Sequence, residues 1–291
     1  MCSFQEDIFI AEMLELIRQA STELPEDVEK ALKLALKKEE ENSVAQYVLE
    51  MISENIQRAR KTSRPLCQDT GLPAFYISYN QSVSTRLIRS CVKKAVVQAS
   101  EKAYLRPNAV SSISGKNSGN NLGSGIPYIE FEEWSKHGIL VKCMLKGGGC
   151  ENVSSQYAIP SPGLEADRDL DGVYTCVMDA VQKAQGKGCA PGILGIGIGG
   201  DRIISMQTAK KQLFRTLDDV NEDPLLVKLE ERLLKDANKL GIGPMGLGGK
   251  TTVLAVKVGA SHRIPASFFV SISYMCWVCR RKEMYYSLDG P

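Results

Sequence analysis

The sequence predicts a mixed α/β fold with a mainly helical N-terminal part followed by a sheet flanked by helices. Near the N-terminus, apolar residues recur every three or four positions over residues 8–20, and Pro25 with the acidic residues after it opens a second helix that runs to about Lys38. Further along, helical segments alternate with strand-like ones, which is typical of a sheet covered by helices. The other expected helices lie at 43–60, 85–103, 169–184, 204–217 and 224–240, and the expected strands at 126–132, 139–145, 253–258 and 267–274; residues 74–78 form a further apolar segment.

The strands at 126–132 and 139–145 are close enough in sequence to pair with each other. We expect a hairpin with residues 136–138 as its turn. A chain of 291 residues can bury a sizeable core, as one large domain or as two smaller ones.

Composition and charge argue against several classes of protein. Hydrophobic residues make up 43% and charged residues 24%, as in ordinary globular proteins. A net charge of +2 without a long basic run gives no basis for binding nucleic acid or an anionic membrane. The acidic start does not resemble a secretory signal, and no apolar segment approaches the roughly 20 residues that span a bilayer. The expectation is a cytoplasmic protein.

The nine cysteines do not indicate a disulfide framework, because the sequence shows no export signal and the cysteines are scattered. Cys67 lies in the segment RPLCQDTG at residues 64–71, a turn stiffened by Pro65 and ended by Gly71. A thiol, an amide, a carboxylate and a hydroxyl follow one another at residues 67–70, which suggests a functional site. The alternative is a surface turn with one buried cysteine. Four cysteines on a terminus, two helices and a strand are expected to pack or to have no role: Cys2, Cys91, Cys176 and Cys143.

Cysteines at turns favour an iron–sulfur cluster over zinc. With only two histidines, an imidazole-rich zinc site is excluded, and the C-x-x-C pair of Cys276 and Cys279 lacks a second pair nearby. The best candidate ligands are Cys67, Cys189 and Cys276, each beside a turn at the end of a secondary-structure element. Three thiolates on a four-iron cluster would leave one iron open as a Lewis acid for a departing hydroxyl.

Two glycine-rich segments do not fit nucleotide-binding patterns. Residues 241–252 carry Met245 where a phosphate loop requires glycine, and β-branched residues follow where a helix should begin. Residues 192–201 lack the G-x-G-x-x-G spacing, so a tightly packed strand and turn is expected there. Such loops can still offer backbone N–H groups to carboxylates.

Five motifs in order give the chain a specific resemblance to a known family. They are residues 64–71, LRPNAV at 105–110, KGGGCEN at 146–152, the glycine-rich residues 240–252, and Cys276-Trp277. From about residue 7 to residue 281 the chain resembles the class I, iron–sulfur-dependent fumarate hydratases and the related L(+)-tartrate dehydratases. The resemblance implies reversible addition of water to fumarate, giving (S)-malate, on a 4Fe–4S cluster, as in the tricarboxylic acid cycle. It also implies one catalytic domain over residues 1–291, with a helical subregion at about 1–62.

The resemblance assigns cluster and substrate roles residue by residue. Cys67, Cys189 and Cys276 match the three cluster ligands, and Gln68 and Asp69 match residues that line the substrate site. Asp69 is expected to assist a base that the partner supplies.

Three further positions match residues around the substrate. Arg106 matches an arginine that grips a substrate carboxylate, a task that suits its planar fork. Gly148 lies in the loop whose backbone amides contact the substrate. His262 matches a histidine near the site, and a hydrogen-bonded core histidine is the alternative.

Two departures from the family pattern leave the substrate and the assembly open. Fumarate hydratases of this class usually carry Ser at the position of Cys150, whereas the tartrate dehydratases share the Gly-Gly-Gly-Cys string; the Glu151-Asn152 that follows is typical of fumarate hydratases. Single-chain members continue into a second domain with further arginines, a lysine and a threonine base. This chain is therefore expected to be an alpha subunit that binds a dicarboxylate together with a beta subunit, in a heterotetramer of two alpha and two beta chains. A hypothesis from another class is a non-catalytic iron–sulfur or zinc-binding scaffold protein.

Overall fold

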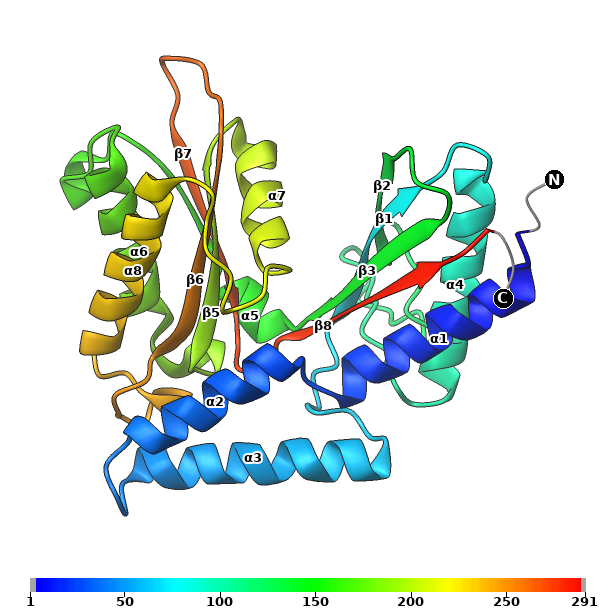
Figure 1. Cartoon of the computed structure of the whole chain (residues 1–291), viewed down its shortest axis with the longest axis horizontal. Coiled ribbons are helices and arrows are strands. Elements are labelled where there is room, and N and C mark those ends of the chain that lie inside the picture. The colour runs from blue at the N-terminus through cyan, green and yellow to red at the C-terminus, as the bar shows by residue number, and fades with distance from the viewer. Residues whose placement is uncertain (1–3, 289–291) are drawn as a thin grey trace. The chain divides into compact units, whose positions relative to one another are not determined.

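The computed structural model describes residues 4–288 and confirms the predicted mixed α/β class; Cys2 lies outside the described residues. Figure 1 shows the helices and strands along the chain. The α-helices are α1 (Glu6–Thr22), α2 (Glu26–Lys38), α3 (Val44–Thr62), α4 (Thr85–Glu101), α5 (Gly148–Asn152), α6 (Leu170–Ala184), α7 (Arg202–Gln212) and α8 (Pro224–Lys239). The strands are β1 (Leu72–Tyr79), β2 (Tyr128–Glu133), β3 (Ile139–Lys146), β4 (Ser155–Ala158), β5 (Gly192–Gly199), β6 (Val253–Ser261), β7 (Phe269–Met275) and β8 (Arg280–Tyr286).

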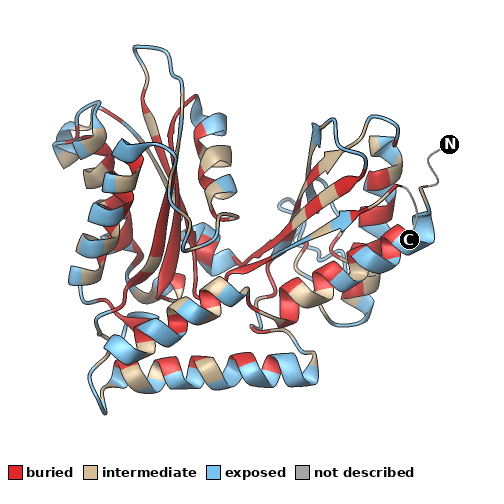
Figure 2. Cartoon of the chain, in the orientation of Figure 1, coloured by how far each residue is buried: buried red, intermediate tan, exposed pale blue. Residues whose placement is uncertain are grey.

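The chain folds into two compact units, each assembled from segments that are distant in sequence. Unit 1 comprises Met1–Pro25, Asn55–Gly148 and Arg280–Pro291, and unit 2 comprises Glu26–Glu54 and Gly149–Cys279. Each unit has its own hydrophobic core, and Figure 2 shows the buried residues on the strands and on the inner faces of the helices. The single catalytic domain over residues 1–291 stays a prediction. The expected N-terminal helices are present, with α1 in unit 1 and α2 in unit 2, and the helical subregion at about 1–62 also stays a prediction.

Unit 1 is a four-stranded sheet in the order β2-β1-β3-β8, against which α1 and α4 pack. β1 is parallel to β2 and antiparallel to β3, while β8 is antiparallel to β3. The predicted hairpin between the strands at 126–132 and 139–145 is therefore wrong. The central position goes to β1, whose Phe75 and Ile77 are fully or almost fully buried, so β2 and β3 pair with β1 and not with each other.

Unit 2 is a four-stranded sheet in the order β4-β7-β5-β6 with helices on both faces, α7 on one and α6 with α8 on the other (Figure 1). The prediction of a tightly packed glycine strand is confirmed by β5, which is buried along its whole length. A Cβ atom at Gly195 or Gly197 would overlap the backbone oxygens of α7, so these glycines let the helix lie directly on the strand. The segment 241–252 leads into strand β6 and not into a helix, which agrees with the rejection of a phosphate loop.

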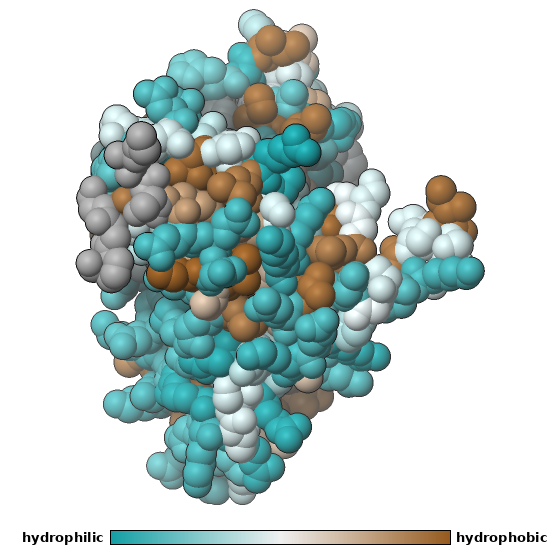
Figure 3. Space-filling model, turned by 90° about the vertical axis from the view of Figure 1, so that its right-hand side faces the viewer, coloured by the Kyte–Doolittle hydropathy of each residue, from teal (hydrophilic) through white to brown (hydrophobic). Residues whose placement is uncertain are grey.

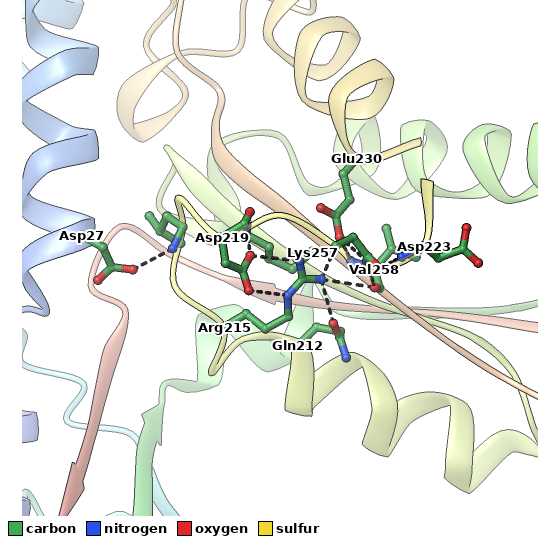
Figure 4. A network of polar contacts seen from close by, with 10 residues as sticks. Asp27, Gln212, Arg215, Asp219, Asp223, Glu230, Lys257 and Val258 are labelled. Atoms are coloured by element: carbon green, nitrogen blue, oxygen red, sulfur yellow. Dashed lines mark hydrogen bonds and ion pairs between the residues drawn. The ribbon is translucent and has the colours of Figure 1, made fainter. Parts of the chain in front are cut away.

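A buried polar network in unit 2 ties the chain after α7 to β6 and α8 (Figure 4). Arg215 binds both oxygens of Asp219 at 2.8 and 2.9 Å and donates to Glu230 at 2.8 Å. The Lys257 ammonium, whose side chain is 4% exposed, donates to the carboxylate and the backbone oxygen of Asp219. Glu230 also accepts the backbone N–H of Val258 at 2.7 Å, so each charge in this network has a partner.

The surface that is visible in Figure 3 is mostly hydrophilic, with hydrophobic residues in separate groups. Among residues 4–288, no helix combines the length and the apolar character that crossing a membrane requires.

Candidate active site

The segment 64–71 begins where α3 ends, and the end of the helix fixes its direction. Ser63 adopts a left-handed conformation with φ of 49°. The N–H of Ser63 donates to the carbonyl of Arg60 at 3.3 Å, and the N–H of Arg64 donates to that of Ala59 at 3.0 Å. This is the paired hydrogen-bond pattern of a Schellman motif, with serine in the position that glycine usually takes. Leu66, 3% exposed, is then held on both sides, since its N–H donates to Ser21 and its carbonyl accepts the Asn55 amide.

The Asp69 carboxylate is fixed by two backbone amides in unit 1. It accepts the N–H of Gly71 at 3.0 Å and the N–H of Gly148 at 2.7 Å. A Cβ atom at Gly147 would lie 2.6 Å from Asp69 Oδ2, so only glycine at this position leaves room for the carboxylate. The loop amide that the resemblance assigns to the substrate thus binds a carboxylate of the protein itself.

Arg106 is positioned from its backbone by a second polar cluster in unit 1. Its N–H donates to the Thr70 hydroxyl at 2.9 Å, and the Asn108 amide donates to the same hydroxyl at 3.2 Å. Asn121, fully buried at φ of 59°, accepts the N–H of Asn108 and donates to the carbonyl of Arg106. The Arg106 side chain is exposed, as Gln68 is, while Thr70 is buried. The first and second motifs, which lie about 35 residues apart, are therefore hydrogen-bonded to each other.

In unit 2, Cys189 occupies a constrained turn before β5. Its φ of 53° is in the left-handed region, which a residue with a side chain adopts at some cost. The glycines on either side of this turn, Gly188 and Gly192, have no room for a Cβ atom because the Tyr274 ring lies there. The carbonyl of Cys189 accepts the N–H of Trp277 at 3.4 Å, so Cys189 and Cys276 lie at the same end of the unit 2 sheet.

A third cysteine of unit 2 lies beside Cys276. The sulfur of Cys150 accepts the N–H of Cys276 at 3.3 Å, and Cys150 and Cys276 are 4% and 8% exposed. Burial raises the pKa of the Tyr274 hydroxyl, and the nearby charges of Cys276, Cys150 and Cys189 raise it further. These three cysteines therefore lie near one buried phenol.

The cysteines that were expected only to pack are confirmed in that role where the structure describes them. Cys91, Cys143 and Cys176 are fully buried in α4, β3 and α6. Burial, with a smaller effect of nearby carboxylates, raises the pKa of Cys91 and Cys176 to about 11. Burial alone raises the pKa of Cys143 still further. None of these thiols is poised to ionise near neutral pH.

His262 is not placed with the unit 2 thiols. It follows β6, whose last residue Ser261 pairs with Gly199 at the far end of β5, and its side chain is exposed. An eight-residue strand separates that end from Cys189, a span of about 25 Å at the usual rise per residue. The alternative of a buried core histidine is wrong, and the role near the site stays a prediction.

Comparison with known proteins identifies the family. The sequence pattern of the family described as "Fumarate hydratase (Fumerase)" matches residues 10–285. The chain belongs to the fumarate hydratase family. It is 50% identical over 272 residues to "Putative fumarate hydratase class I" of Geobacillus stearothermophilus, covering 92% of this chain and 53% of that protein. The chain therefore spans about half the length of this relative.

Two further relatives match over nearly their whole lengths. "Putative L(+)-tartrate dehydratase subunit alpha" of Methanocaldococcus jannaschii is 37% identical over 284 residues, which are 96% of this chain and 97% of that protein. "L(+)-tartrate dehydratase subunit alpha" of Escherichia coli K12 is 32% identical over 276 residues, which are 92% of this chain and 88% of that protein. The resemblance inferred from the five motifs is confirmed.

The three cysteines that were predicted to hold a cluster are divided between the units. Cys189 and Cys276 lie together in unit 2, and Cys67, half-buried, lies in unit 1 beside Asp69. Within residues 4–288, no group of three or more His, Cys, Asp or Glu side chains is arranged to hold a metal ion. The thiols of Cys189 and Cys276 are of the right ligand type for iron, because soft sulfur ligands without histidine are typical of iron–sulfur sites.

Several residues that organise this site were missed in the sequence. Thr70, Asn108 and Asn121 lie in or beside the motifs, but only the fold shows that their side chains bind the backbone of the loops. Arg280 was also missed. The one available signal was the pair of arginines directly after an apolar segment, where buried residues are expected; the structure shows that both Arg280 and Arg281 are buried.

Proposed function

We propose that this chain is the alpha subunit of a 4Fe–4S-dependent hydro-lyase, most specifically a fumarate hydratase that interconverts fumarate and (S)-malate. The observation that carries the proposal is the assembly of Asp69, Arg106 and Gly148 from three separate motifs onto one hydrogen-bonded frame in unit 1. A carboxylate, a guanidinium and a backbone N–H are the groups that proton transfer and dicarboxylate binding require.

Residues of unit 1 are assigned separate roles in substrate binding and in proton transfer. The exposed Arg106 guanidinium binds one carboxylate of the substrate in a bidentate manner. Asp69, oriented by the amides of Gly71 and Gly148, holds or accepts a proton next to the bound substrate. The exposed Gln68 adds a hydrogen-bonding amide to the same loop. Because Gly148 already donates to Asp69, a substrate carboxylate that used this amide would have to share it with Asp69 or displace it.

Cys67, Cys189 and Cys276 would hold the cluster, which when bound supplies a Lewis-acidic iron for the hydroxyl of the substrate. A beta subunit would supply the second carboxylate clamp and the principal base, and the "subunit alpha" in the names of two relatives supports such a partner. We propose a heterotetramer of two alpha and two beta chains. The catalytic role of His262 stays a prediction, since its exposed side chain lies at the opposite end of the unit 2 sheet from Cys189.

L(+)-tartrate dehydratase is the second candidate, and two observations favour it. The relatives that match this chain over nearly their whole lengths carry that name. In addition, Cys150 stands where fumarate hydratases usually carry Ser. The higher identity to the Geobacillus relative favours fumarate.

An anaerobic assay of the chain purified together with its beta subunit tests the proposal. We expect a kcat/KM for fumarate at least tenfold above that for L(+)-tartrate; the reverse ratio would select the second candidate. The isolated chain with an intact cluster should be at least about 10²-fold slower, since an essential base is then missing. No turnover of either substrate by the cluster-loaded pair would favour the scaffold hypothesis.

A further inference from the structure

Arg280 is the largest fully buried side chain of residues 4–288. It is the first residue of β8 and is 1% exposed. Arginine is almost never fully buried unless its donors are satisfied, because removing the guanidinium from water carries a large desolvation penalty. Its position therefore requires specific acceptors.

The acceptors of Arg280 connect the sheet of unit 1 to the loop that carries Asp69. Its Nε donates to the carbonyl of Leu145 at 3.1 Å, and its Nη1 donates to the carbonyl of Asp69 at 2.6 Å. Leu145 also pairs with Arg280 in the ladder between β3 and β8, so one end of this link is a rigid strand. The other end is the carbonyl of Asp69, which lies in a loop outside any strand.

The carboxylate of Asp69 and the guanidinium of Arg280 are both held close to Gly147. A Cβ atom there would lie 2.6 Å from Asp69 Oδ2 and 3.5 Å from Arg280 Nη2. Asp69 is thus fixed at three points: its backbone oxygen by Arg280 and its carboxylate by the amides of Gly71 and Gly148. Without the first point, Asp69 would be held only through its carboxylate, by the amides of Gly71 and Gly148.

We propose that Arg280 is a positioning residue, which holds the backbone of the Asp69 loop against β3 so that the carboxylate keeps its bonds to Gly71 and Gly148. The inference rests on the proposed function only where Asp69 is assigned a part in proton transfer. The planar guanidinium is suited to this task, since its fork bridges two carbonyls in one fixed geometry, whereas an ammonium acts as a point charge.

Amide hydrogen exchange on the full chain tests the positioning role without any assay of activity. The variants are Arg280→Met and Arg280→Lys, with Lys282→Gln as the matched control, because Lys282 lies on the same strand with an exposed side chain. In Arg280→Met we expect exchange of residues 66–71 to rise at least tenfold while β1 and β3 keep their protection. Arg280→Lys should recover part of the protection, and Lys282→Gln should match the parent chain.

Kinetics of the complex with the beta subunit then separate positioning from mere stability. A small displacement of a reacting group can lower the rate by about 10²-fold, so Arg280→Met should lower kcat strongly and change KM little, with partial rescue in Arg280→Lys. Unchanged exchange at residues 66–71 in Arg280→Met would overturn the inference. So would an equal loss of protection throughout unit 1 in both variants, because Arg280 would then serve folding in general. If the parent complex converts neither substrate, the proposed function fails while the exchange result still decides the role of Arg280.

Discussion

The loops that carry the candidate site are held differently in the two units. In unit 1, the Asp69 loop is fixed by hydrogen bonds from side chains to backbone, through Asp69, Thr70 and Arg280. In unit 2, the turn at Cys189 is fixed by its left-handed backbone and by the Tyr274 ring, which fills the space that two glycines leave. The first loop should therefore be sensitive to changes of polar groups and the second to changes of volume.

The largest expected effect concerns the sulfur ligands. Cys276→Ser should leave the anaerobically reconstituted chain with almost no cluster, because a serine hydroxyl is a poor replacement for a soft thiolate on iron. Iron and sulfide per chain are the measurement. Cys279→Ser is the matched control, since Cys279 is fully buried three residues further on and should keep the cluster. Loss of the cluster in the Cys279 variant alone would show that the wrong sulfur was chosen.

The second largest effect is expected from a substitution in the Asp69 loop of unit 1. Asp69→Asn keeps the shape of the side chain, but an amide cannot accept from both backbone N–H groups with equal strength or take up a proton at neutral pH. With the beta subunit present, kcat should fall by about 10²-fold, with a smaller change in KM. Asp179→Asn makes the same exchange in unit 2, where the carboxylate binds Tyr157 and Lys183, and should leave kcat within about twofold. Equal losses in both variants would contradict a special role for Asp69.

A smaller effect tests whether unit 2 responds to volume. Gly192→Ala would place a methyl group into the Tyr274 ring and should lower the free energy of unfolding by about 1–3 kcal/mol. Chemical denaturation measures the loss. Gly163→Ala is the control in the same unit, because nothing lies within 4 Å of the added Cβ atom. If the two alanine variants are equally stable, the turn at Cys189 does not depend on packing.

The smallest expected effect is a pH dependence that belongs to unit 2. Partial burial by itself would raise the pKa of Asp219, but its hydrogen bonds to Arg215 and Lys257 outweigh burial and lower the pKa. A lowered pKa means that the stabilisation is fully present above the pKa of an unfolded aspartate, about 3.9, and is lost as the pH falls through the folded value.

Asp219→Asn should therefore lose stability at pH 7 relative to the parent chain, and the gap should narrow below about pH 4. We expect a gap of about 1 kcal/mol, since the Asp219 side chain is 31% exposed and solvent screens part of the interaction. Thermal unfolding at several pH values provides the test. A gap that is constant from pH 7 to pH 3 would contradict the assignment.

The sequence by itself determined the family, every α-helix of residues 4–288 except α5, and the strands β2, β3, β5, β6 and β7. Apolar periodicity and the turn residues around Pro65, Gly71 and Pro25 are local signals, so they can be read without the fold. The argument against a phosphate loop at residues 241–252 was equally local, because it used spacing and the residue types that follow, and the segment does lead into strand β6.

Only the tertiary structure decided which distant residues meet. Strand β1 lies between β2 and β3 because its apolar residues fill the centre of unit 1, a choice that depends on packing and not on the short distance in sequence between β2 and β3. The same holds for Arg280, which reaches the carbonyl of a residue 211 positions away, and for His262, which strand register places at the opposite end of the sheet from Cys189. Such contacts are set by long-range pairing and by the need to satisfy buried polar groups, and neither leaves a periodic signal in the sequence.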